Sequence, residues 1–377
     1  TPGDHFSPRT GSAIPTVVQG LATVAAQDPD HVRQVVVLDR STLRPRYSVA
    51  ELVEYDRAPW LTGRDRRVDV VRARLGGTRR ATVRFFAPVA EAIAARPPSV
   101  VLAHNAPVLA GMLADSPHRV VLYAHNDLLR TYTKTEAARA LGAVGAIVCV
   151  SEALAEQTRA QLPAALAERV RVVPNGVDCA WFAPAEAEAA ATRDDGRLHV
   201  GFVGRMIREK GPDVLVRAAG LLRRPDLRFT LVGSQGFARD APLSPYEREL
   251  RELAERSGSD IRFEPFVDRT ALPDLLRTFD VLVVPSRWAE PSGLTAGEGM
   301  ATGLPVIASR IGGLPDVVGD AGILIAPDDP TALAAALSAL ADDPGERARR
   351  GRRSRQHALE HDWSRSWSIL RGVIDEL

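Results

Sequence analysis

Short runs of apolar residues, many of them β-branched, alternate with longer helix-like segments along almost the whole chain. Within each run the apolar residues are consecutive rather than alternating, which is typical of parallel strands covered by helices on both faces. The pattern therefore predicts βαβ units and an α/β fold built on parallel sheets. The candidate strands are 34–38, 99–103, 119–124, 146–150, 170–173, 199–203, 228–232, 261–263, 281–285, 305–308 and 322–326.

The length of the chain predicts more than one domain, because 377 residues exceed what a single compact core usually needs. Ala, Glu and Asp dominate residues 186–196, where apolar periodicity is weak, as in an inter-domain linker. We therefore expect two doubly wound domains joined near residues 178–197. Residues 1–3 have the composition of a loop, whereas such a domain normally begins with a buried strand, so we expect a short strand to precede them.

Composition limits the partners and the compartment. A net charge of +1 argues against nucleic acid as a main partner. No apolar run approaches the roughly 18 residues that span a bilayer, and we expect no signal peptide. Cys149 and Cys179 lack metal-ligand spacing, so we expect reduced thiols, no metal site and a cytoplasmic protein.

The basic residues are unevenly distributed. The stretch from Arg57 to Arg84 holds nine arginines, counting both ends. We expect this stretch to form a solvated face beside a variable loop, and contact with an anionic acceptor or a membrane surface is the alternative. Only two of the 48 basic residues are lysines, Lys134 and Lys210. Because arginine fills nearly every basic position, a lysine in this chain is a candidate functional residue.

Two carboxylates follow the predicted strand 281–285. Glu290 lies in a loop rich in Gly, Pro and Ser, and Glu298 lies eight positions later on the predicted helix. The first can accept hydrogen bonds from sugar hydroxyls and the second from a ribose. The backbone amides between them offer an anion site at the helix N-terminus, since such amides attract phosphate. A capped helix with two surface acids is the alternative. The amides belong to Ser292, Gly293, Leu294 and Thr295.

Two basic residues follow the predicted strand 199–203. The strand ends at Gly204, and Arg205 and Lys210 lie five positions apart before a helix that Pro212 opens. Two cations at a strand end can bind a diphosphate and stabilise it as a leaving group. Because lysine is so rare in this chain, Lys210 strengthens the prediction.

Polar residues and a glycine turn in the first half complete the candidate site. His125 ends one predicted strand and His104 the strand before it, although a lone histidine in such a place is more often structural. Gly11 lies in a turn that leads into a helix. The alternative there is an ordinary helix start capped by Thr10 or Ser12.

The segment with the two glutamates resembles the Glu–seven residues–Glu signature of the retaining nucleotide-sugar glycosyltransferases of family 4. The segments 300–306 and 312–316 also match that family, while Ser292 and Gly299 stand where phenylalanine and alanine are common. The resemblance implies a GT-B fold, in which two Rossmann-like domains face each other across a cleft. Residues 1–180 would then form the acceptor-side domain, completed by a C-terminal helix at 362–377, and residues 181–361 the nucleotide-sugar-binding domain.

The resemblance also implies the role of each candidate residue. Glu290 would hold the donor sugar, Glu298 the ribose, and Arg205 with Lys210 the diphosphate. His125 would face the donor sugar. The resemblance further implies that the loop with Gly11 approaches the diphosphate or the acceptor, that Gly204 borders the donor nucleotide, and that the base packs at Val267.

The implied reaction is transfer of a sugar, with retention, from a nucleotide diphosphate sugar to an acceptor hydroxyl. We expect it to need neither a metal ion nor a cofactor other than the donor. The acceptor is a sugar, a polyol, a lipid-linked molecule or a natural product. The alternatives are an epimerase or phosphorylase on the same scaffold and a non-catalytic nucleotide-sugar-binding protein. A dinucleotide oxidoreductase is disfavoured, because no Gly-x-Gly-x-x-Gly follows a first strand.

Overall fold

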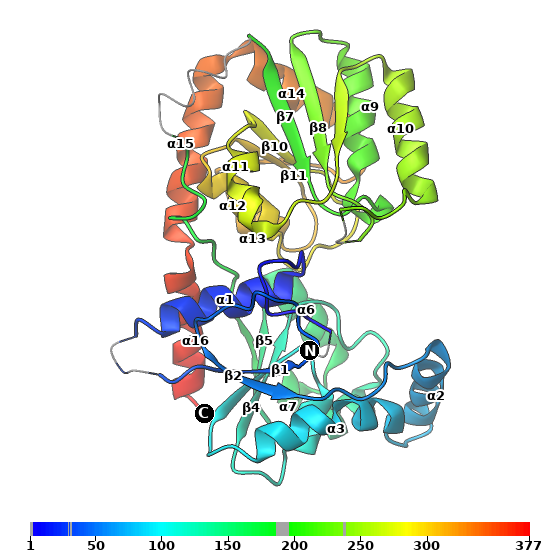
Figure 1. Cartoon of the computed structure of the whole chain (residues 1–377), viewed down its shortest axis with the longest axis vertical. Coiled ribbons are helices and arrows are strands. Elements are labelled where there is room, and N and C mark those ends of the chain that lie inside the picture. Colours follow the sequence, from blue (N-terminus) through cyan, green and yellow to red (C-terminus); the bar gives the residue numbers. More distant parts are fainter. Residues whose placement is uncertain (1–2, 29, 31, 186–195, 237–238) are drawn as a thin grey trace. The chain divides into compact units, whose positions relative to one another are not determined.

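The structure is a computed structural model that describes residues 3–28, 30, 32–185, 196–236 and 239–377 (Figure 1). It divides into two compact units, of which unit 1 comprises Thr1–Asn175 with Ser364–Leu377 and unit 2 comprises Gly176–Trp363. Most of the predicted linker, 186–195, lies outside the described residues.

The boundary lies five residues earlier than the predicted division after residue 180. A Cβ added to Gly176 would lie 2.5 Å from the backbone of Asp362, and Val177 forms a β-bridge with Asp362. Val177 and Phe182 are both buried in a core cluster of unit 2. The segment after Asn175 is therefore held by the packing of unit 2.

Unit 2 is built on a six-stranded parallel sheet with the order β12-β11-β10-β7-β8-β9. The order reverses between β7 and β10, which is the switch point of a doubly wound sheet. The strands are β7 (Leu198–Val203), β8 (Leu227–Val232), β9 (Ile261–Glu264), β10 (Val281–Val284), β11 (Val306–Ser309) and β12 (Ile323–Ile325).

Each face of this sheet buries its own hydrophobic cluster. Val281 and Val283 of β10 lie in the cluster under α9, α10 and α14, whereas Leu282 lies in the cluster under α11, α12 and α13. Successive strand residues thus point to opposite faces, which explains why the strands are apolar at consecutive positions. The helices are α9 (Pro212–Leu222), α10 (Pro245–Ser257), α11 (Leu272–Leu276), α12 (Leu294–Ala301), α13 (Leu314–Val318), α14 (Pro330–Asp342) and α15 (Pro344–Glu360).

Unit 1 contains a four-stranded parallel sheet with the order β3-β4-β5-β6 and a separate parallel pair, β1-β2. The strands are β1 (Val35–Asp39), β2 (Glu51–Tyr55), β3 (Val100–His104), β4 (Arg119–Ala124), β5 (Val144–Cys149) and β6 (Val170–Val172). The helices are α1 (Ala13–Ala25), α2 (Gly63–Arg74), α3 (Arg80–Ala94), α4 (Val108–Met112), α5 (Lys134–Leu141), α6 (Glu152–Gln161), α7 (Ala164–Ala167) and α16 (Trp363–Asp375).

Strand β2 was not among the predicted strands. Its sequence carries Glu51 and Glu54, which form ion pairs with arginines, and only Tyr55 is buried. An edge strand of this kind lacks the continuous apolar run by which the buried strands were found.

The C-terminal helix α16 packs on unit 1. The Trp367 Nε1 donates to Asp28 Oδ2 over 2.7 Å, and the Ser366 hydroxyl donates to the Pro174 carbonyl over 2.7 Å. No helix within the described ranges is both long and apolar enough to cross a membrane.

Candidate functional site

The loops that follow β7 and β10 carry the residues predicted to bind the donor. These two strands flank the switch point of the unit 2 sheet, where doubly wound folds bind ligands. Glu290 is 5% exposed, and its Oε1 lies 2.5 Å from the Lys210 Nζ. The Ser286 hydroxyl donates to the same oxygen over 2.6 Å. The buried carboxylate is therefore balanced by a cation that is itself one quarter exposed, with a side-chain exposure of 26%.

Glycine places the loop that carries Lys210. Lys210 ends the 3-10 helix η1 (Arg208–Lys210), and Gly211 follows with a φ of 65°. A Cβ at Gly211 would lie 2.0 Å from the Pro285 carbonyl oxygen, at the end of β10. Only glycine combines the left-handed backbone with this close approach, so it brings Lys210 beside the β10 loop.

A buried ion network ties the same two loops together. The Arg287 guanidinium donates to both oxygens of Asp213, over 2.5 and 2.7 Å, and the Tyr246 hydroxyl donates to Asp213 over 2.6 Å. Burial of Asp213 would raise its pKa, but the hydrogen bonds from Arg287 and Tyr246 leave the pKa lowered overall. The Arg287 amide also donates to the Glu209 carbonyl over 2.8 Å. The network thus supports the loop before Lys210 without being part of the site.

The Glu290 backbone is fixed by a third loop. The Gly313 amide donates to the Glu290 carbonyl over 2.6 Å. Gly312 has a φ of 59°, and a Cβ there would lie 2.3 Å from the same carbonyl oxygen. The two glycines after β11 therefore hold the loop in which Glu290 lies.

Glu298 lies in the second turn of α12 and is 3% exposed. The Arg269 guanidinium donates to its Oε1 over 2.6 Å, and the Arg269 side chain is only 14% exposed. Gly293 precedes the helix with a φ of 118° and supplies no capping side chain. The first amides of a helix have no partner within it, so those of Leu294 and Thr295 are available to an anion.

The other predicted residues of unit 2 follow β7 or β9, or precede α12. Ser292 is 6% exposed, and Gly204 packs tightly on Gly233, whose Cβ would lie 2.0 Å from the Gly204 carbonyl oxygen. The Arg205 side chain is exposed, and its Nε donates to the Gln235 carbonyl over 2.9 Å. Val267 is half-buried between β9 and η2 (Arg269–Ala271), against the cluster under α12.

Unit 1 holds a second polar cluster at the carboxyl ends of β3 and β4. The His104 Nδ1 and the His125 Nε2 lie 2.8 Å apart, so one of them donates to the other. Both rings stack with Tyr123, at centroid distances of 4.9 and 4.8 Å. Asn105 has a φ of 49°, and its Oδ1 accepts a hydrogen bond from the His125 amide over 2.8 Å.

Burial sets the charge of these histidines. It lowers the pKa of His125 to about 3 and lowers the pKa of His104 well below its usual range. Both rings are therefore neutral near neutral pH. Their mutual hydrogen bond uses one nitrogen of each ring.

Gly11 lies one residue before the N-cap of α1. It is exposed and lies outside the left-handed region. The N-cap is Ser12, which makes no side-chain cap and donates instead to Asp4 Oδ1 over 2.9 Å. The alternative to a functional turn was a helix start capped by Thr10 or Ser12. No such side-chain cap is present at the described start of α1.

Two residues of the candidate site escaped the sequence analysis. Ser286 follows β10 directly, so its place at a strand end was a usable signal. Arg269 lies 29 positions before Glu298, and nothing in the sequence pairs the two. In a chain with so many arginines, only the folded structure singles this one out.

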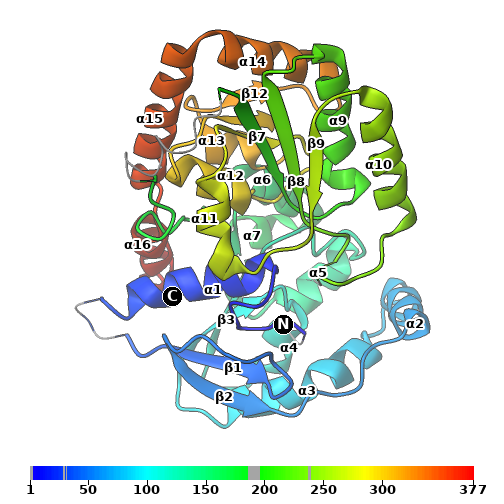
Figure 2. The same cartoon turned by 45° about the horizontal axis from the view of Figure 1, so that its top comes forward.

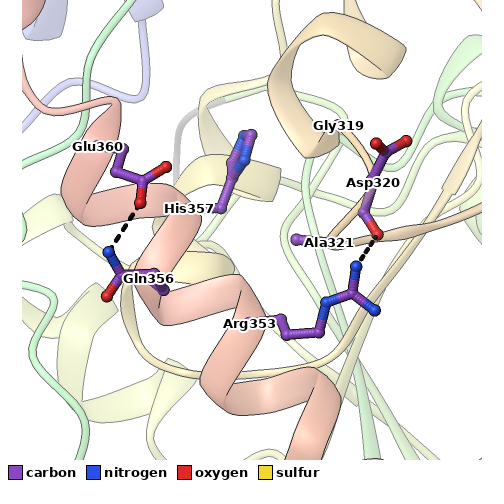
Figure 3. Close-up of a pocket in the computed structure, with 7 residues that line it drawn as sticks. All are labelled: Gly319, Asp320, Ala321, Arg353, Gln356, His357 and Glu360. Carbon is purple, nitrogen blue, oxygen red and sulfur yellow. Dashed lines mark hydrogen bonds between the residues drawn. The ribbon is translucent and has the colours of Figure 1, made fainter.

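A shallow pocket of about 440 Å³ lies elsewhere on unit 2, between the loop 319–321 and α15 (Figure 3). Arg353, Gln356, His357 and Glu360 of α15 line one side of it. None of the predicted site residues lines it, and the ring of His357 hydrogen-bonds the Val317 carbonyl over 3.1 Å. We assign no function to this pocket.

Two family models match the chain. The model described as Glycosyltransferase Family 4 matches residues 18–181, and the model described as Glycosyl transferases group 1 matches residues 197–343. Together they span most of both units. The chain belongs to glycosyltransferase family 4. The two matches confirm, for this family 4 chain, the resemblance seen in the segment from Glu290 to Glu298.

Relatives of the family 4 chain carry a consistent name. It is 37% identical over 213 residues to a D-inositol 3-phosphate glycosyltransferase of Arthrobacter sp., covering 54% of this chain and 49% of that protein. It is 39% identical over 220 residues to a protein of the same name from Streptomyces avermitilis, covering 54% and 46%. The chain thus spans about half the length of the curated relatives it matches.

Solved structures confirm the fold of the family 4 chain. HepE from Anabaena, in complex with UDP and glucose, matches with a TM-score of 0.72 and 19% identity, covering 96% of each chain. Sucrose-phosphate synthase from Thermosynechococcus elongatus matches with a TM-score of 0.74 and 20% identity, covering 99% of this chain and 95% of the other. The fold is therefore GT-B, with two Rossmann-like domains, as predicted.

Proposed function

We propose that this chain transfers a sugar from a nucleoside diphosphate sugar to an acceptor hydroxyl, with retention of the anomeric configuration and without a metal ion. The observation that carries the proposal is the contact of Lys210 with Glu290 at the switch point, next to the N-terminus of α12. A cation and free helix amides suit a diphosphate, and a buried carboxylate beside them suits sugar hydroxyls.

Each group has a distinct task in this proposal. Lys210, Arg205 and the first amides of α12 bind the diphosphate and stabilise its charge as it leaves. Glu290 binds the sugar. Glu298, held by Arg269, binds the ribose. Gly204 and Val267 border the nucleotide, and we retain the predicted roles of His125 and Gly11 toward the donor.

The reaction proceeds on one face of the sugar. The bond between the anomeric carbon and the phosphate oxygen breaks, and a bond from that carbon to the acceptor oxygen forms on the same face. The acceptor proton passes to the departing phosphate, whose basicity Lys210 and Arg205 moderate. No side chain needs to form a covalent intermediate.

Known proteins suggest the first substrates to test. The structure of HepE contains UDP and glucose, so UDP sugars are our first donor candidates. The relatives named D-inositol 3-phosphate glycosyltransferase make D-inositol 3-phosphate the first acceptor candidate.

We also propose a reducing, cytoplasmic setting. Cys149 and Cys179 are both free thiols, as expected in a reducing compartment, and burial raises the pKa of each to about 11.

Thermal unfolding with UDP, GDP, ADP and dTDP tests the nucleotide, because a ligand that binds only the folded state raises the melting temperature. We expect one diphosphate to stabilise the chain clearly more than the others. Transfer from its sugars is then followed by NMR with excess chelator present, and the anomeric configuration of the product is read directly. An inverted product, or loss of activity that Mg²⁺ restores, would contradict the proposed mechanism. Epimerisation of the donor sugar would favour an epimerase, and phosphorolysis without transfer would favour a phosphorylase.

A further inference from the structure

Helix α2 of unit 1 exposes a row of aliphatic side chains. Val68, Val71 and Leu75 are 47%, 57% and 84% exposed. Their spacing of three and four residues places them on one face of the helix, with Leu75 as its C-cap residue. We call these three residues the aliphatic crest. Large apolar side chains gathered in this way usually mark an interaction site.

Arginines border the crest on both sides. At helical spacing, Arg64 lies in line with the crest, Arg67 and Arg74 flank it on one side, and Arg72 flanks it on the other. Among the described residues, no carboxylate lies within 4.0 Å of any of the four guanidinium groups. We call these four residues the arginine rim.

The acidic side chains of α2 are engaged elsewhere. Asp65 forms the capping box with Thr62 at the start of the helix. Asp69 is buried and accepts hydrogen bonds from the Ala81 amide, over 3.1 Å, and from the Thr82 amide, over 2.7 Å. Asp69 therefore attaches α2 to the start of α3, and its carboxylate is hydrogen-bonded to the N-terminal amides of α3.

The crest faces away from the interior of unit 1. Asp69 and Ala73, the buried residues of α2, lie on the opposite side of the helix from Val71 and Leu75. Figures 1 and 2 both show α2 at the outer edge of unit 1, beyond the start of α3.

Two other arginines of the stretch have structural partners. Arg57 pairs with Asp39 over 2.9 Å, and Arg79 pairs with the buried Glu136 over 2.5 Å. The arginine-rich stretch therefore has two parts, one that holds the fold and one that faces solvent. The expected solvated face accounts for the rim but not for the aliphatic crest within it.

We propose that α2 docks unit 1 onto an anionic lipid bilayer. In that contact the crest enters the boundary between headgroups and acyl chains, and the rim binds lipid phosphates. Basic side chains around an apolar row are complementary to such a surface. A polynucleotide would use the rim alone and leave the crest in water. This inference does not depend on the proposed glycosyl transfer.

Sedimentation with vesicles tests the proposal on the full chain. Vesicles of phosphatidylcholine are compared with vesicles of phosphatidylcholine and phosphatidylglycerol. We expect the anionic vesicles to bind the chain at least about tenfold more tightly, and the binding to weaken with added salt. Absence of binding to both kinds of vesicle would overturn the proposal, including the case in which the chain retains an RNA oligonucleotide instead.

Two variants separate charge from apolar contact. The rim variant, Arg67→Gln with Arg72→Gln and Arg74→Gln, should bind anionic vesicles on the order of 100-fold more weakly. The crest variant, Val71→Ser with Leu75→Ser, should lose about tenfold. The matched control removes three exposed arginines from unit 2 and should bind like the wild type. It carries Arg256→Gln, Arg262→Gln and Arg352→Gln.

Circular dichroism first establishes that each variant folds. Exposed positions tolerate such changes, and the single variant Leu75→Ser serves if the double crest variant does not fold. Equal losses in the rim variant and the control would show that net charge alone drives binding, which overturns the proposal. A crest variant that binds vesicles like the wild type would also overturn it. So would a wild type that is a dimer and a crest variant that is a monomer, because the crest would then be a contact between two copies of the chain.

Discussion

Lys210 and Glu290 are 80 residues apart in the chain, yet the Lys210 Nζ lies 2.5 Å from the Glu290 Oε1. The carboxylate is buried, and among the described side chains its other partner is Ser286. The groups predicted to bind phosphate and sugar are thus one ion pair before any donor arrives. A donor phosphate would have to share or displace this contact.

The pair should show energetic coupling. Lys210→Met leaves a buried carboxylate without its cation and should lower the free energy of unfolding by about 2 kcal/mol, allowing for the partial exposure of Lys210. The double variant with Glu290→Gln should lose less than the sum of the two single variants. Urea denaturation measures all four proteins, and strict additivity would show that the contact carries no energy in solution.

Glu290→Gln should act on catalysis more than on nucleotide binding. The amide keeps the shape of the side chain but removes the charge nearest the reacting sugar, so kcat should fall on the order of 100-fold. Affinity for the nucleoside diphosphate should change little, as measured by calorimetry. Glu255→Gln, on the exposed face of α10, is the matched control. Unchanged kcat would remove Glu290 from the proposed site.

Glu298→Gln should show the opposite behaviour. Ribose contacts are equal in the ground state and the transition state, so this variant should raise KM and weaken the bare nucleotide with little change in kcat. Arg269→Ala should reproduce the pattern, because Arg269 holds the Glu298 carboxylate. Calorimetry and steady-state kinetics decide the matter. If Glu298→Gln lowers only turnover while Glu290→Gln lowers nucleotide affinity, the two roles are reversed.

Gly211 and Gly258 allow a clash to be separated from backbone strain. Their φ angles are 65° and 68°, but a Cβ at Gly211 would lie 2.0 Å from the Pro285 carbonyl oxygen, whereas a Cβ at Gly258 has nothing within 4 Å. Gly258→Ala should cost about 1 kcal/mol of stability. Gly211→Ala should cost at least about 2 kcal/mol more and should weaken nucleotide binding through Lys210. Equal melting temperatures for the two variants would contradict the close approach.

The buried histidines predict a stability that falls in mild acid. The pKa of His125 is lowered to about 3 in the fold, whereas an unfolded histidine titrates near its usual value of 6.5. As the pH falls below 6.5, the unfolded chain binds a proton that the folded chain does not, so stability is lost. For one histidine the loss between pH about 7 and pH about 5 is about 2 kcal/mol. Urea denaturation should show a smaller loss for His125→Asn than for the wild type.

Much of the architecture follows from local sequence. Consecutive apolar residues mark a strand buried on both faces wherever the strand lies, and the eleven runs picked on this basis all correspond to strands of the structure. Strand β2 lacked this signal because Glu51 and Glu54, which pair with arginines, interrupt its apolar residues. The two compact units divide after Asn175, five residues before the predicted boundary, because Val177 and Phe182 pack in the unit 2 core.

The candidate site divides in the same way. Residue types at the ends of strands pointed to Lys210, Glu290, Glu298 and His125, because a parallel sheet gathers such ends at one edge. The sequence by itself therefore determined the fold class and the elements that carry the site. Only the tertiary structure decided the partners, since Arg269 reaches Glu298 and His104 reaches His125 across separate elements. Ion pairs and hydrogen bonds act over a few ångströms of space, and no spacing along the chain encodes that distance.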